Sequence, residues 1–185
     1  MTSKLADLVI DFSTDPFNPQ KNFDIAVEYQ KQNQTASAIS FYLRTAEYGY
    51  DTHPDLVYAS LLAASLCFDS QQNRVHTVIN LMMQAISYQP TRPEAYFLFS
   101  RFCERDKEWQ KVYTWASVGL SFVDKHDPLP IEVDYAGSVG LLFEKAVSGW
   151  WIGQKTESQE IFIDLLKRDI PKLYEDAIIN NLKQF

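Results

Sequence analysis

The chain has 185 residues, of which 46% are hydrophobic and 14% aromatic, and this apolar content excludes an intrinsically disordered chain. Only 6 glycines occur and no Asn-Gly or Asp-Gly pair marks a tight hairpin, so an all-β fold is not expected. The formal charge of −7 disfavours nucleic acid and anionic membranes as partners. The longest apolar uncharged stretch, Leu56 to Phe68, is well short of the about 20 residues that a membrane span needs.

The first dozen residues carry acidic groups inside their apolar segment and lack a small-residue cleavage site, so they do not resemble a signal peptide. Their pattern predicts a short helix that ends at Asp15-Pro16. Cys67 and Cys103 lie inside apolar helical patterns and form no CxxC motif, which favours buried reduced thiols over a disulfide. These features predict a cytoplasmic protein.

A repeat organises the rest of the chain. Ala85 and Gly119, like Ile86 and Leu120, are separated by one tetratricopeptide period of about 34 residues. We therefore predict an all-α fold in a single domain spanning 1–185, a right-handed α-solenoid of about four tetratricopeptide-like helix pairs. The predicted pairs cover residues 19–50, 55–90, 93–122 and 139–166. An unrelated α-solenoid or helical bundle is the alternative.

Prolines and spacings set the details of this prediction. Pro19 and Pro93 open helix pairs, and Pro171 opens a capping helix over 171–183 with apolar residues that include Leu173. The distance in sequence from Thr45 to Ala85 exceeds the repeat period by six positions, so we place an insertion around Tyr50–His53 and Gln71–Asn73. The link over 123–138 contains Asp-Pro-Leu-Pro and is predicted to be non-helical.

Three stretches carry a resemblance to a known family: NQTASAISFYLRTAEYG, RPEAYFLFSRFCERDKEWQKVYTWASVGL, and GLLFEKAVSGWWIGQ with the closing AIINNL. They resemble the tetratricopeptide region of glycosyltransferase-associated proteins of marine cyanobacteria and their phages. In that family the repeats commonly accompany a separate sugar-transferase domain. Because Met1 almost directly precedes the repeats and no Asp-x-Asp pair occurs to hold a metal–diphosphate, the resemblance implies a relative of the accessory part only.

No catalytic motif is present in the sequence. His53, His76 and His126 lie far apart without metal-ligand spacing, and GxSxG, GxGxxG and P-loop motifs do not occur. Asp124–Asp127 is interpreted as a solvated loop rather than a set of metal ligands. We therefore predict a non-enzyme without cofactor or metal.

The solenoid geometry predicts a concave groove formed by the first helix of each pair. Aromatic walls with an arginine near the middle would suit a protein or peptide ligand with an acidic or carboxylate anchor. The residues predicted to line this groove are Phe23, Val27, Gln30, Leu61, Phe68, Phe97, Arg101, Arg105, Phe143 and Trp150.

Alternatives remain open for several of these residues. Phe97 and Phe143 are equally compatible with packing between repeats, and Arg101 and Arg105 with pairing to neighbouring glutamates. Trp150 and Trp151 point about 100° apart on a helix, so one is expected in the core and the other in the groove or at the last helix.

The predicted function is a non-catalytic scaffold or adaptor for protein binding. One alternative is an accessory module of a glycosyltransferase system that recruits the enzyme or holds its acceptor. The other is a phage structural or homo-oligomeric protein, with a location in the virion rather than in the host cytoplasm.

Overall fold

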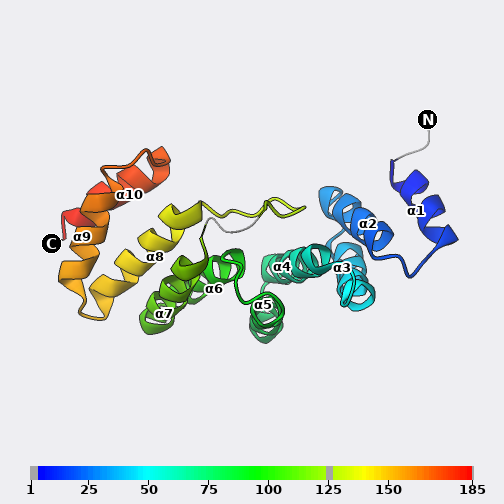
Figure 1. Cartoon of the computed structure of the whole chain (residues 1–185), viewed down its shortest axis with the longest axis horizontal. Coiled ribbons are helices and arrows are strands. Elements are labelled where there is room, and N and C mark those ends of the chain that lie inside the picture. The colour runs from blue at the N-terminus through cyan, green and yellow to red at the C-terminus, as the bar shows by residue number, and fades with distance from the viewer. Residues whose placement is uncertain (1–3, 124–126, 185) are drawn as a thin grey trace. The chain divides into compact units, whose positions relative to one another are not determined.

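The computed structural model describes residues 4–123 and 127–184. Within these ranges the chain is helical and contains no strand, so the all-α prediction is confirmed (Figure 1). The described α-helices are α1 (Lys4–Thr14), α2 (Pro19–Lys31), α3 (Thr35–Gly49), α4 (Pro54–Ser70), α5 (Val75–Tyr88), α6 (Glu94–Arg105), α7 (Trp109–Gly119), α8 (Gly137–Trp151), α9 (Lys155–Leu165) and α10 (Lys172–Leu182). A 3-10 turn, η1 (Leu120–Phe122), follows α7.

The helices form two compact units. The N-terminal unit contains α1 to α5 together with Pro128–Glu132, and the C-terminal unit contains α6 to α10 together with Val133–Ala136. α1 matches the short helix predicted before Asp15-Pro16. The single-domain interpretation of the whole chain stays a prediction.

In the N-terminal unit, polar side chains and prolines fix the helix starts. Pro19 lies in the first turn of α2, where a missing N–H costs nothing, and the Asn18 side chain accepts a hydrogen bond from the Lys21 amide at 3.1 Å. The buried Asn22 side chain donates to the carbonyls of Pro16 and Asn18 at 3.0 and 2.8 Å. These bonds fix the path by which the chain enters the first helix pair.

The inserted residues lie mainly in α4 and the turn after it. α4 has 17 residues and α2 has 13. The first helices of the two pairs start at Pro19 and Pro54, and this separation exceeds the repeat period by one residue. The second helices start at Thr35 and Val75, and this separation exceeds the repeat period by six residues. The segment Tyr50–His53 therefore holds at most one of the extra residues that the prediction divided between Tyr50–His53 and Gln71–Asn73.

In the C-terminal unit, small residues allow the helices to approach closely. A Cβ added to Gly119 would lie 2.9 Å from Tyr96 Cβ and 3.0 Å from Leu141 Cδ2, so α7 contacts both α6 and α8 there. Gly153, at φ +89°, makes the turn between α8 and α9.

The capping helix packs on the last pair through one apolar cluster. Ile178 of α10 is buried with Ala146 of α8 and with Phe162 and Leu165 of α9. Leu173, expected on the apolar face of this helix, is instead 79% exposed. It lies in the first turn of α10, outside the cluster that Ile178 joins.

Between η1 and α8, residues 127–136 form no helix, as predicted (Figure 1). Asp124, Lys125 and His126, interpreted from the sequence as part of a solvated loop, lie outside the described residues. Both cysteines are free and buried, which agrees with reduced thiols. No helix of the described chain combines the length and apolar character that a membrane crossing requires.

Candidate protein-binding surfaces

The first helices of the N-terminal unit border a cleft of about 460 Å³, which we call the α2–α4 cleft. Two of the predicted groove residues, Val27 and Gln30, line it from α2. Its complete lining is Val27, Gln30 and Lys31 of α2, Tyr42 of α3, Ala63 and Leu66 of α4, and Pro130, Ile131 and Glu132 of the non-helical link. The Tyr42 hydroxyl donates a hydrogen bond to the Gln30 side-chain oxygen, which fixes one wall.

Other predicted residues on α2 and α4 lie elsewhere. Phe23 is 4% exposed and packs its ring against Tyr42, so it belongs to the core and not to a binding surface. Leu61 is also buried and borders a different groove, described below. Phe68 is partly buried with the Arg74 guanidinium 5.9 Å from its ring centre.

The misplaced α4 residues have one physical cause. The prediction placed Phe68 in the groove, whereas the cleft is lined by Leu66, two positions earlier in the same helix. A shift of two positions rotates a side chain by about 200° around a helix. The extra residues lie mainly inside α4. An alignment of the repeats that places them outside this helix therefore assigns the wrong face of α4 to the cleft.

In the C-terminal unit the predicted aromatic wall is occupied by internal contacts. Phe97 is 1% exposed and packs against Tyr135, with the two ring centres 5.5 Å apart. Of the two roles considered for Phe97, it therefore has the one in the core. Phe143 is partly buried and packs against Phe162 and Tyr174.

The two predicted anchor arginines also have internal partners. Arg101 Nη1 lies 3.6 Å from Asp134 Oδ2, and Arg101 Nε lies 3.7 Å from Glu144 Oε1. The Arg105 guanidinium stacks over the Phe102 ring at 4.6 Å. The carboxylates that Arg101 was expected to recruit from a ligand are therefore supplied by the chain itself.

Glu144 is a buried acid that the sequence reasoning missed. It is 2% exposed, and its Oε2 has no hydrogen-bond partner among the described residues. Burial, aided by the charge of Glu104 and opposed by Arg101, raises the pKa of Glu144 from 4.5 to about 8. A signal was present, because Leu141, Glu144 and Ser148 follow the spacing of one buried helix face.

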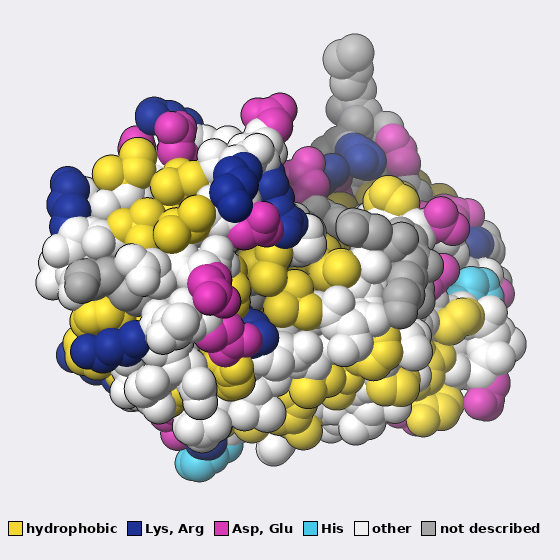
Figure 2. Space-filling model, turned by 60° about the vertical axis from the view of Figure 1, so that its left-hand side comes forward, with side chains coloured by type: hydrophobic (Ala, Val, Ile, Leu, Met, Phe, Trp, Pro, Cys, Tyr) yellow, Lys and Arg dark blue, Asp and Glu magenta, His cyan; other side chains and the backbone are white. Residues whose placement is uncertain are grey.

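The two adjacent tryptophans, of which one was expected in the core and the other in the groove or at the last helix, both lie outside the buried core. Trp150 is partly buried, with the Lys155 ammonium 4.0 Å from its ring centre. Trp151 is 61% exposed, yet it stacks on Trp109 of α7 with ring centres 5.4 Å apart. On the face drawn in Figure 2, basic and acidic side chains are interspersed and form no clean basic patch.

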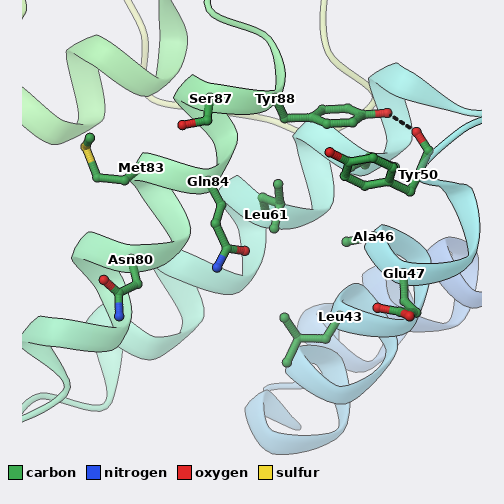
Figure 3. A pocket seen from close by; sticks show the side chains of 11 residues that line it. Leu43, Ala46, Glu47, Tyr50, Leu61, Asn80, Met83, Gln84, Ser87 and Tyr88 are labelled. Carbon is green, nitrogen blue, oxygen red and sulfur yellow. Dashed lines mark hydrogen bonds between the residues drawn. The ribbon is translucent and has the colours of Figure 1, made fainter.

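A second open groove, the α3–α5 groove, was not predicted. Its volume is about 880 Å³, and it lies between α3, α4 and α5 of the N-terminal unit. The groove is lined by Asn80, Met83, Gln84 and Ser87 of α5 and by Leu43, Ala46 and Glu47 of α3, and in Figure 3 Leu61 of α4 lies between the two helices. At one end the Tyr88 hydroxyl donates to the Tyr50 carbonyl oxygen.

Neither surface presents catalytic or metal-binding chemistry. Across residues 4–123 and 127–184, no three histidine, cysteine or carboxylate side chains gather as a metal site. Burial raises the pKa of Cys67, and burial with the charge of Glu108 raises that of Cys103 to about 11, so both thiols are poor nucleophiles. What the surfaces offer is apolar area with a few polar groups.

No family model matches the chain, and no curated protein matches it in sequence. Solved structures show the fold. MamA has a TM-score of 0.67 at 11% identity, covering 95% of this chain and 89% of that one. PilF of Pseudomonas aeruginosa has a TM-score of 0.70 at 8% identity, and the match covers 95% of this chain and 72% of that one. A Podosopora anserina protein of the kinesin light chain type, with nearly identical TPR-like repeats, has a TM-score of 0.61 at 15% identity. That match covers 98% of this chain and 86% of the other. The chain thus has the fold of TPR-like helical repeats.

Proposed function

We propose that the chain is a non-catalytic scaffold that binds a protein partner, with the α2–α4 cleft as its docking surface. The observation that carries the proposal is an open space of about 460 Å³ between the first helices of two neighbouring pairs. Val27 and Leu66 line it and are only partly buried, so apolar area remains for a ligand to cover.

The polar groups of the cleft indicate what such a partner contains. The exposed Gln30 amide can hydrogen-bond to the main chain of an extended segment, and the Lys31 ammonium can pair with a carboxylate. The acidic anchor predicted for the partner is retained, but Lys31 takes the role that Arg101 was expected to have.

The proposal is tested by selecting binders from a displayed library of random short peptides on the purified full-length chain. Selected peptides should lose at least about tenfold in affinity for Leu66→Glu, because this change places an unpaired carboxylate in the apolar cleft. Leu43→Glu is the matched control, since Leu43 is a partly exposed leucine of the α3–α5 groove. Equal affinity for both variants, or failure to select any binder, would refute the proposal.

A role as an accessory module of a glycosyltransferase system is the second candidate. It rests on the family resemblance and on the largely exposed Trp151 ring, whose stack with Trp109 offers an aromatic surface for a sugar. It would place the protein in a marine cyanobacterium or its phage. Binding of acceptor glycans to the wild type, lost in Trp151→Ala, would favour this candidate over the peptide-binding one.

A homo-oligomeric or virion role is the third candidate. The mass in solution tests it directly, because a monomer at micromolar concentration would leave the surfaces free for another protein.

A further inference from the structure

The α2–α4 cleft has a wall that does not come from a helix. Pro130, Ile131 and Glu132 line it opposite Val27 of α2 and Leu66 of α4. These three residues belong to the non-helical link, more than sixty positions after Leu66 in sequence, yet Pro128–Glu132 is part of the N-terminal unit. We call Pro128–Glu132 the resident segment.

The resident segment has the pattern of an extended peptide lying on a surface. Leu129 and Ile131 are partly buried, whereas Pro128, Pro130 and Glu132 are exposed. Alternation with a period of two is what an extended chain shows when one side contacts protein and the other faces water. Both prolines occupy exposed positions, where their fixed φ favours the extended form and their missing N–H costs nothing.

Side chains, and not backbone hydrogen bonds, hold the resident segment in place. Among the described residues, none of the backbone hydrogen bonds outside the helices involves positions 128–132. The cleft beside the segment also retains about 460 Å³ of open space. A segment that is partly buried and free of backbone pairing opens at low free-energy cost.

We infer that the resident segment is a built-in occupant of the α2–α4 cleft, which a partner must displace. The partner is then an extended peptide of the same chemistry, with aliphatic side chains at alternate positions and an acidic residue after the second, as in Leu129-Pro130-Ile131-Glu132. The structure shows that the segment forms one wall of the cleft, while its role as a competitor rests on the proposed function.

Occupancy is tested without any partner, by thiol labelling of two positions in the segment. Ile131→Cys is a partly buried position that lines the cleft, and Pro128→Cys is its control at an exposed position outside the lining. With 5,5′-dithiobis(2-nitrobenzoic acid) as probe, we expect Ile131→Cys to react about tenfold more slowly, as for a cleft occupied about nine-tenths of the time. The buried native cysteines give a slow background, which the wild type measures.

A cleft variant shows whether the protection comes from the cleft. Adding Leu66→Glu, or Val27→Glu on the opposite wall, should bring the two labelling rates together while the helical circular dichroism stays unchanged. Equal rates of Ile131→Cys and Pro128→Cys in the unmodified cleft, or protection that survives both cleft variants, would overturn the inference.

Competition is tested with a fluorescent peptide that carries residues 127–136. Leu129→Ser with Ile131→Ser should release the segment and tighten binding of this peptide about tenfold relative to the wild type, because apparent affinity scales with the fraction of open clefts. Pro128→Ser changes an exposed residue of the segment that does not line the cleft and should bind like the wild type.

The two proposals fail in different ways. If library peptides bind in a Leu66-dependent manner but the released variant binds the fluorescent peptide no tighter than the wild type, the cleft is a docking site and the resident segment is not its competitor. If Ile131→Cys is protected but no peptide binds even the released variant, the segment is a fixed part of the fold and the proposed function fails.

Discussion

The buried carboxyl of Glu144 makes stability depend on pH in a direction opposite to that of a salt-bridged acid. Its pKa is raised from 4.5 to about 8 in the folded chain, so the folded state holds a proton that the unfolded state has lost between these values. The contribution of Glu144 to stability is therefore greatest below about pH 4.5, falls as the pH rises toward 8 and is constant above that.

The size of the effect follows from the two pKa values. Between pH 5 and pH 8 the preferential ionisation of unfolded Glu144 lowers the free energy of unfolding by about 3 to 4 kcal/mol. For cooperative unfolding of the whole chain of 185 residues, that corresponds to a fall of about 10 °C in the midpoint of thermal unfolding. The charged groups that face the site are Arg101, Glu104 and Asp134, with the Tyr174 phenol from α10.

Glu144→Gln removes the titrating group and keeps its shape. We expect the variant to lose this part of the pH dependence and to be more stable than the wild type at pH 8, as measured by thermal unfolding followed by circular dichroism from pH 5 to pH 8. Glu160→Gln, an exposed carboxyl on α9, is the control and should follow the wild type. A Glu144→Gln variant with the pH slope of the wild type would refute the reasoning.

Three further predictions concern packing, capping and thiol chemistry. Gly119→Ala should destabilise the C-terminal unit by about 1 to 3 kcal/mol in chemical denaturation, because the new methyl group overlaps Tyr96 and Leu141. The cost of this overlap exceeds the gain from the better helix propensity of alanine. A more stable variant would contradict the close approach of the helices. Asn22→Ala should cost the N-terminal unit about 1 to 3 kcal/mol, because the Pro16 carbonyl loses its partner and the Asn18 carbonyl keeps only its bond from the backbone amide of residue 22. An unchanged denaturation midpoint would show that water replaces the side-chain amide. The thiol of Cys103, whose pKa is raised to about 11, should react with iodoacetamide at pH 8 only on unfolding, and mass spectrometry of the native protein would detect early modification if this is wrong.

Local signals predicted the helices well, because their causes are local. Pro19 opens α2, and Pro93 and Pro171 directly precede α6 and α10, close to where the sequence predicts helix starts. The repeat spacing led to the fold because each helix pair must bury its apolar face against the next.

The candidate surface was predicted less well, because it depends on rotation and on distant contacts. Nothing in the sequence marks where inside α4 the extra residues lie, so Leu61 was assigned to the wrong side of its helix. The contacts of Ile131 with the cleft, and of Asp134 with Arg101, join residues far apart in sequence, and no local pattern encodes them. Of the predicted groove residues, Val27 and Gln30 line the cleft, whereas Phe23 and Phe97 lie in the core.

The division into two units has an optical consequence. The 4 tryptophans of the chain, Trp109, Trp115, Trp150 and Trp151, all lie in the C-terminal unit. Tryptophan fluorescence thus reports the unfolding of that unit alone. The N-terminal unit, which contains the α2–α4 cleft, contributes no tryptophan signal. Far-ultraviolet circular dichroism follows the helices of both units, so non-coincident fluorescence and dichroism transitions would reveal that the cleft-bearing half unfolds independently.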